Sequence, residues 1–129
     1  MSQVIIYGNA RHLNRRRQDI SDAIHQSLVS AIGLPVTKRF QRFIDLSSEN
    51  FIYLDDRSDT YTIIEISMFE GRSVEAKKQL IRLIYATLQA DCDLDPQDVE
   101  ITIFETPASN WGIRGLPADE LTLPYKVDV

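Results

Sequence analysis

Residues 61–88 read YTIIEISMFEGRSVEAKKQLIRLIYATL, and they predict a strand, a tight turn and a helix in succession. Side chains of residues 61–69 alternate between two faces, and β-branched residues are frequent, as is typical of a buried strand. Gly71 permits the turn, and Ser73 stands where a helix N-cap belongs. The helix then presents one apolar stripe, formed by Leu80, Ile81, Ile84 and Leu88.

Arg72 is the residue of this stretch that points to chemistry, because it lies in the turn beside the first amides of a helix. Helix amides favour anions, and a guanidinium can hold a carboxylate through two parallel hydrogen bonds. The sequence alone leaves two interpretations open. Arg72 either binds a carboxylate or is a surface residue that closes the turn.

Composition restricts the class of protein. The 129 residues are 43% hydrophobic and 26% charged, which is typical of one globular domain spanning residues 1–129. A net charge of −5 argues against a general nucleic-acid binder. Cys92 has no second cysteine with which to form a disulfide, and no apolar run or leader suggests a membrane span or secretion. We expect a soluble, cytoplasmic protein without cofactor, bound metal, membrane or nucleic-acid partner.

An internal repeat organises the chain, relating residues 2–46 to residues 61–105 at an offset close to 60. Each half is predicted as strand, long helix and strand. The first half has strands at residues 3–7 and 39–46 around a helix from Arg15, capped by Asn14, to Ile32. The second has strands at 61–69 and 99–105 around the helix described above. The tail, residues 106–129, is predicted to run over the surface, with an extra strand near its end.

Two β-α-β units with long crossovers predict an α+β fold: a four-stranded sheet with both helices on one face. The predicted strands nevertheless carry apolar residues on both faces, as Ile5 and Tyr7 alternate with Val4 and Ile6. A sheet that is apolar on both faces is buried on both. We therefore expect a second copy of the chain to cover the bare face, in an oligomer.

The first helix raises a separate question, because three arginines, Arg15 to Arg17, are predicted in its first turn. Cations there oppose the helix dipole at a cost of about 0.3–1 kcal/mol each. The arginines either form a solvated face, offset by nearby aspartates, or mark an anion site. His12 is predicted in the preceding loop and His25 on the exposed side of the helix.

Several ordered motifs resemble the longer-chain branch of the tautomerase superfamily, which includes malonate semialdehyde decarboxylase and cis-3-chloroacrylic acid dehalogenase. The matching segments, besides the repeat itself, are Gly33-Leu34-Pro35 with residues 38–41, the EGRS turn at 70–73, residues 95–99, and Asn110 to Gly115 in the tail. The resemblance spans nearly the whole chain. It implies two β-α-β units whose bare sheet faces pack together in a homotrimer.

The resemblance also implies a site at the amino terminus, where the family uses a proline exposed by removal of the initiator methionine, together with carboxylate-binding arginines. Here Ser2 stands at the proline position, and Arg72 matches one of two arginines. Glu70 stands at the other arginine position, and Lys38 replaces the aspartate of the decarboxylase. The carry-over therefore gives Ser2 and Arg72 as catalytic candidates. The candidates for substrate binding are Lys38, Arg39, Glu70, Trp111 and Arg114.

Three functions follow from these residues. In the first, a free Ser2 amine, with an ordinary pKa of about 7.7–8.0, transfers protons on a small 2-keto or enol acid held by Arg72. In the second, the fold has lost its catalysis and binds a small anion or a protein partner. In the third, which is unrelated to the resemblance, the chain is a ferredoxin-like regulatory module that binds a metabolite.

Overall fold

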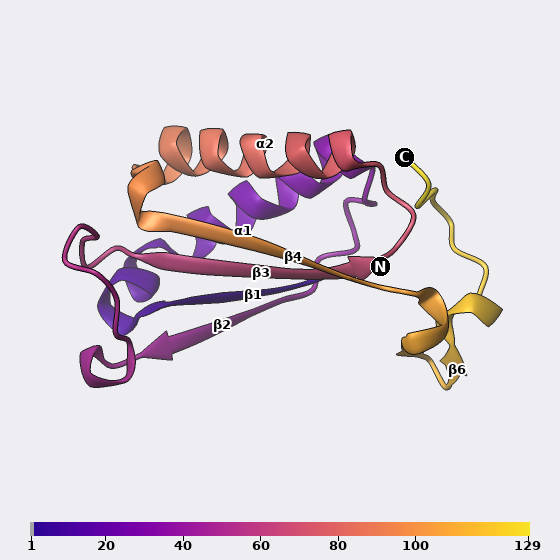
Figure 1. Cartoon of the computed structure of the whole chain (residues 1–129), viewed down its shortest axis with the longest axis horizontal. Coiled ribbons are helices and arrows are strands. Elements are labelled where there is room, and N and C mark those ends of the chain that lie inside the picture. Colours follow the sequence, from indigo (N-terminus) through magenta and orange to yellow (C-terminus); the bar gives the residue numbers. More distant parts are fainter. Residues whose placement is uncertain (1) are drawn as a thin grey trace.

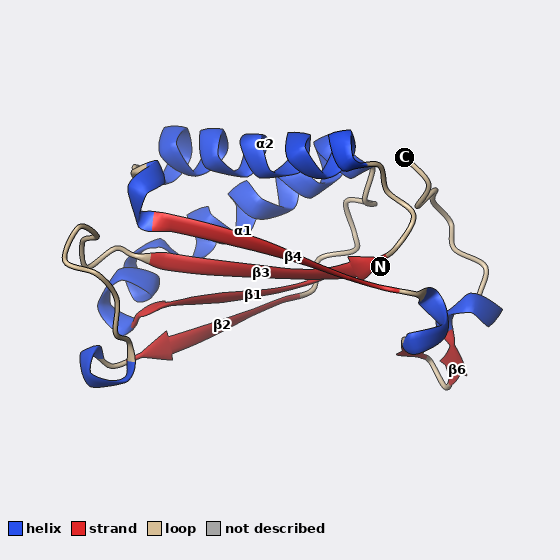
Figure 2. Cartoon of the chain, viewed as in Figure 1, coloured by secondary structure: helices blue, strands red, loops and turns tan. Residues whose placement is uncertain are grey.

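A computed structural model describes residues 2–129 (Figure 1). Its main elements are β1 (Ser2–Asn9), α1 (Ala10–Ile32), β2 (Gln41–Leu46), β3 (Thr62–Phe69), α2 (Val74–Cys92) and β4 (Val99–Thr106). They form a sheet of order β2-β1-β3-β4. The predicted fold class is confirmed: both helices cover one face of a four-stranded sheet and leave the other face without helices (Figure 2).

The strand register contains the internal repeat as an approximate two-fold. β1 pairs with β2 and β3 with β4 in parallel, whereas β1 and β3 are antiparallel. Raising each number by 60 turns the Val4–Gln41 pair into the Ile64–Ile101 pair. The two β-α-β units thus correspond in strand register at an offset of 60 and are joined through the pairing of β1 with β3.

The helix ends repeat the same correspondence. Leu34 N–H donates to Leu28 O, and Leu94 N–H donates to Leu88 O, so both helices end in the same wrapped-back turn. The residue at each turn is left-handed, Gly33 with φ 69° and Asp93 with φ 55°. Leu34 and Leu94 are both buried, and each anchors the chain as it leaves its helix.

The core lies between the helices and the sheet. Alternate strand residues and the apolar stripes of both helices fill it, namely Val4, Ile6, Ile64, Ile66 and Met68 from the strands and Ile20, Ile24, Leu28, Leu80, Ile84 and Leu88 from the helices. Cys92 belongs to this core, and burial raises the pKa of its thiol to about 11. The thiol is therefore a packing group.

Several local predictions were wrong, among them the loop position of His12, which lies buried within α1. The first helix begins at Ala10, not Arg15, because Gly8 lets β1 run straight into it: a Cβ at Gly8 would lie 3.1 Å from Leu13. His25 is buried, not exposed, since Nε2 lies 2.6 Å from Val36 O in the loop that folds back over α1. The second strand starts at Gln41 instead of residue 39. The second helix continues past Leu88 to Cys92.

The tail folds against one end of the sheet. It carries a short hairpin, β5 (Gly112–Ile113) with β6 (Leu116–Pro117), instead of a strand near residue 129. Its apolar residues pack around Phe69 in a second small core, and Trp111 meets Phe69 edge-on at 5.0 Å. Within residues 2–129, neither helix is long and apolar enough to cross a membrane.

Candidate active site at the amino-terminal end of the sheet

Four strand ends meet at the end of the sheet that carries the amino terminus (Figure 1). Ser2 begins β1 opposite Met68, near the end of β3, and the EGRS turn follows directly. On the other side, Val4 N–H donates to Phe40 O at 3.0 Å, so the chain entering β2 passes beside the start of β1. Segments far apart in the sequence therefore lie at the same end of the sheet, namely residues 2, 38–40 and 69–73.

Arg72 is buried, with 5% of its surface exposed, so it is not the surface residue of the alternative interpretation. Its Nη1 donates to Phe69 O at 3.3 Å, while Nε and Nη2 are buried without a hydrogen-bond partner among the described residues. Burial lowers the pKa of the guanidinium, and the neighbouring Tyr125 and Glu105 act in the opposite direction. A buried cation with two unsatisfied donors is costly unless an anion supplies the acceptors.

Two further buried polar groups at this end lack partners among residues 2–129: Ser2 Oγ and Tyr125 Oη. Ser2 is 2% exposed, on the helix-covered side of β1. Burial raises the pKa of the Tyr125 hydroxyl, which remains a neutral donor beside Arg72. A hydroxyl donor beside two guanidinium donors suits a bound carboxylate.

The carboxyl-terminal tail lies over the EGRS turn. Ser73 Oγ donates to Val129 O at 3.0 Å, and a Cβ at Gly71 would lie 3.2 Å from Val127 Cγ1. Gly71 has φ 130°, a conformation that favours glycine, so this turn needs glycine for both backbone and space. The tail also brings Tyr125 close to Arg72.

The other predicted site residues lie around this end in different states. Lys38 is half-buried in a turn in which its N–H donates to Pro35 O. Arg39 is engaged elsewhere, because its Nη1 lies 2.6 Å from Asp22 Oδ1. Glu70 is exposed, and its N–H donates to Thr106 O. Arg114 is exposed at the hairpin turn with φ 51°.

Trp111 packs on Phe69 in the small core at this end of the sheet. Sequence reasoning missed Tyr125 and Glu105. Glu105 is the last but one residue of β4, lies near Arg72, and pairs with Lys77 at 2.6 Å. Tyr125 lies in a tail without periodicity, so no sequence pattern marked it as a neighbour of Arg72. The proposed removal of Met1 concerns a residue outside the described range.

Comparison with known proteins decides the family. A family model described as tautomerase enzyme matches residues 38–114, more than half of the chain. The chain belongs to the tautomerase family. This finding removes the ferredoxin-like alternative. The matched region of the chain includes Lys38, the EGRS turn, Trp111 and Arg114, whereas Ser2 lies outside it.

One relative and two solved structures are similar to the chain. It is 39% identical to 2-hydroxymuconate tautomerase of Comamonas testosteroni over 57 residues, which are 44% of this chain and 90% of that enzyme. The fold matches malonate semialdehyde decarboxylase with a TM-score of 0.80 at 21% identity, over 89% of this chain and 93% of the other. A fused 4-OT asymmetric trimer matches with a TM-score of 0.79 at 25% identity, over 91% and 96%.

Proposed function

We propose that this tautomerase-family protein binds a small 2-keto or enol acid at the amino-terminal end of its sheet and transfers a proton on it slowly. The observation that carries the proposal is Arg72, which is buried with Nε and Nη2 unpartnered among the described residues. A substrate carboxylate would accept from both nitrogens at once. Burial excludes competing water and strengthens such a pair.

In this proposal the Ser2 amine, exposed by removal of Met1, is the base. It takes the hydroxyl proton of an enol and returns a proton to carbon, so that the enol becomes the ketone with no change in composition. Cationic Arg72 and Lys38 at the same end of the sheet would disfavour the ammonium form of this amine. A primary amine with an ordinary pKa of about 7.7–8.0 is partly unprotonated near pH 7 and can then act as a base.

The same residues disfavour the other reactions of the family. Lys38 stands where the decarboxylase resemblance implies an aspartate, and Glu70 stands where it implies an arginine. Loss of one positioned acid or base costs about 10²–10⁴-fold in rate. We therefore expect neither efficient decarboxylation of malonate semialdehyde nor hydrolysis of chloroacrylates. Tautomerisation requires only one base and one anion anchor.

A homotrimer belongs to the proposal, since a fused 4-OT of the same fold is a trimer. It is supported by the face of the sheet opposite the helices. That face carries Ile5, Tyr7, Ile44, Ile63 and Phe104, of which Ile44 and Phe104 are 38% and 49% exposed. Other subunits packed on this face would bury it and would surround the site with their own residues.

Steady-state assays with phenylenolpyruvate, malonate semialdehyde and cis-3-chloroacrylate test the activity, after intact-mass analysis shows whether Ser2 is amino-terminal. We expect slow ketonisation of phenylenolpyruvate alone, lost in Arg72→Ala and increased in Ser2→Pro. Arg82→Ala, which removes an exposed arginine of α2, is the control. Efficient decarboxylation by the natural sequence, or an unaffected Arg72→Ala variant, would contradict the proposal.

A second function is supported by Glu70 and Lys38, which stand where the resemblance implies an arginine and an aspartate of the catalytic site. It is a tautomerase fold without catalysis that binds a small carboxylate or a protein partner through the same end of the sheet. Calorimetric titration with fumarate and oxaloacetate separates the two functions. Binding that depends on Arg72 without turnover of any enol favours this second function. A retained Met1 or an acetylated Ser2 favours it as well.

A further inference from the structure

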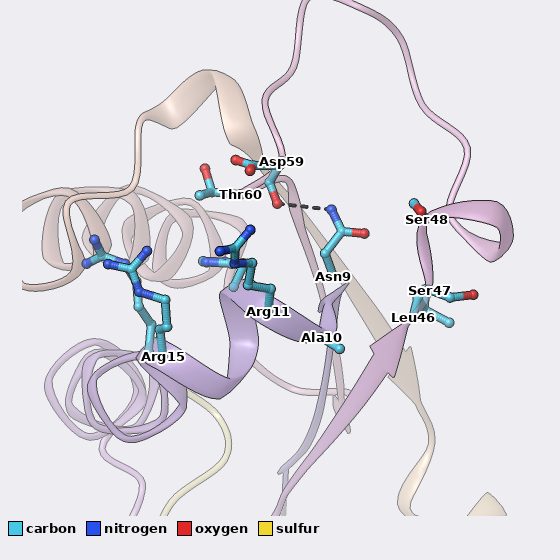
Figure 3. A pocket seen from close by; sticks show the side chains of 11 residues that line it. Asn9, Ala10, Arg11, Arg15, Leu46, Ser47, Ser48, Asp59 and Thr60 are labelled. Carbon is cyan, nitrogen blue, oxygen red and sulfur yellow. Dashed lines mark hydrogen bonds between the residues drawn. The ribbon is translucent and has the colours of Figure 1, made fainter.

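The opposite end of the sheet contains a cavity of about 700 Å³ that the proposed function does not use. It lies where β1 enters α1 and where the connection between β2 and β3 returns to the sheet (Figure 3). Its lining comes from Asn9–His12, Arg15 and Arg16 of the first strand and helix, from Leu46–Ser48 at the end of β2 and after it, and from Asp59 and Thr60 before β3. This volume suits a small metabolite.

The cavity is strongly basic. Arg11, Arg15 and Arg16 line it, and Arg11 and Arg15 extend from the first turns of α1 toward the segment of Asp59 and Thr60 (Figure 3). Arg16 donates to Cys92 O, but neither Arg11 nor Arg15 has an ion pair or hydrogen bond to another described side chain. The carboxylate of Asp59 is the one acidic group in the lining, against three guanidinium groups.

The backbone adds to this positive charge. The first turn of α1 contains no acidic residue, and the side chain of Asn9 gives no cap hydrogen bond. The first N–H groups of the helix therefore have no side-chain acceptor and lie beside the arginines. Asn9 instead donates from Nδ2 to Asp59 O at 3.0 Å and to Tyr53 Oη at 3.2 Å. Its Oδ1 is buried without a partner among the described residues, an acceptor for a ligand hydroxyl.

The two-fold of the repeat shows why this end differs from the amino-terminal site. At an offset of 60, Thr62 corresponds to Ser2 and His12 to Arg72. Thr62 Oγ1 donates to Thr60 O at 2.8 Å, so His12 Nε2, 2.9 Å away, must be the donor to Thr62 Oγ1. These counterparts satisfy one another internally. At this end of the sheet, the cationic groups without a partner among the described residues are instead Arg11 and Arg15, which line the cavity.

We propose that this cavity is a second binding site, for a small multiply charged oxyanion such as a phosphate ester or a di- or tricarboxylate. The guanidinium groups of Arg11 and Arg15 would hold its charged group in front of the first N–H groups of α1. The hydroxyls of Ser47, Ser48 and Thr60 would contact the rest of the ligand. The site lies at the opposite end of the sheet from Ser2 and Arg72 and takes no part in proton transfer there.

Isothermal titration calorimetry at low ionic strength tests the proposal, with inorganic phosphate, pyrophosphate and citrate as probes. We expect the double variant Arg11→Gln/Arg15→Gln to weaken binding of the best probe by about 100-fold. The matched control is Lys78→Gln/Arg82→Gln, which removes the same charge from exposed positions of α2. It should leave binding within about twofold. Preference for pyrophosphate or for citrate tells phosphate esters from polycarboxylates.

The variant Arg72→Gln separates this site from the proposed active site. We expect it to leave binding of the best probe unchanged, even if it abolishes turnover of enol acids. Three results would overturn the proposal: no probe binds, the α2 control weakens binding as much as the Arg11/Arg15 variant, or Arg72→Gln removes binding. Failure of the tautomerase assays alone would leave this second site standing.

Discussion

At the scale of single residues, the unusual group is Arg72, whose buried guanidinium lowers the stability of the folded protein. A buried charge with unsatisfied donors destabilises the fold, and replacing it with an apolar side chain of similar length is often neutral or stabilising. Function and stability therefore make opposite demands on this position. The contrast between them can be measured.

We predict that Arg72→Met raises the free energy of unfolding of the ligand-free protein by about 1 kcal/mol. The same variant should weaken fumarate binding about 10–100-fold, since it removes a charge-assisted bidentate contact. Urea unfolding and calorimetry provide the two measurements. Arg82→Met, at an exposed position, is expected to change neither. A loss of more than about 1 kcal/mol in Arg72→Met would mean that its bond to Phe69 O is structural.

His12 predicts a pH dependence. Burial and then Arg16 lower its pKa, and Asp59 and Asp98 only partly oppose them. The unfolded chain then binds the proton more readily than the folded chain. Stability is full above the unfolded pKa of about 6.5 and falls as the pH decreases from there toward the lower folded pKa.

We expect His12→Gln to flatten the dependence of urea unfolding on pH between about 7.5 and 5.5, a range above the titration of ordinary carboxylates. The variant will lower stability at pH 7.5, because His12 Nε2 donates to Thr62 Oγ1. The diagnostic quantity is therefore the slope, not the absolute stability. An unchanged slope in His12→Gln would assign the effect to another group.

At the scale of elements, the repeat gives each helix an equivalent end with a different residue. Gly33 and Asp93 both occupy the left-handed position after their helix, and each helix closes with the same pair of leucines. Glycine adopts this conformation without strain, whereas a residue with a Cβ is penalised. The two halves thus provide matched positions for one measurement.

We predict that Asp93→Gly stabilises the protein by about 0.5–1 kcal/mol and that Gly33→Asp destabilises it by a similar amount. No heavy atom lies within 4 Å of a Cβ built at Gly33, so the loss would come from backbone conformation and not from a clash. Thermal and urea unfolding of the single and double variants give the values. Equal signs for the two substitutions would refute this explanation.

At the scale of the whole molecule, the open face of the sheet, which is the face opposite the two helices, is not covered by helices of the same chain within residues 2–129 (Figure 2). Ile5 lies between Arg42 on β2 and Glu65 on β3, so the face combines apolar residues with charges of both signs. On this face, Tyr7 forms a hydrogen bond with Glu65, and this bond is the main reason why the pKa of the Tyr7 hydroxyl is raised. Such a mixed face suits a self-complementary interface better than exposure to water.

We expect sedimentation equilibrium to show a trimer for the natural chain and a monomer for Ile5→Glu, which places a charge at the centre of the open face. Val74→Glu is the control, because Val74 is 63% exposed on α2, away from this face. A stable monomer of the natural chain at micromolar concentration would contradict the trimer. Dissociation of both variants would mean that the interface lies elsewhere.

The sequence by itself determined the α+β fold, the two β-α-β units, the parallel pairing within each and the oligomeric expectation. These depend on local signals: alternation in residues 62–68, apolar stripes, Gly33 and the EGRS turn. Each of these signals can be recognised within a few residues, and the two halves of the repeat provide the strand and helix patterns twice. Comparison with the tautomerase family confirmed the resemblance on which the site was predicted.

Only the tertiary structure decided that Arg72 and His25 are buried, that Tyr125 lies beside Arg72, and that α1 starts at Ala10 beside a basic cavity. The burial of Arg72 and His25 and the position of Tyr125 depend on contacts between separate segments, such as the tail over Gly71 or the Val36 loop over His25. The free energy of burying a polar group depends on which partners reach it. Those partners exist only once the chain has folded.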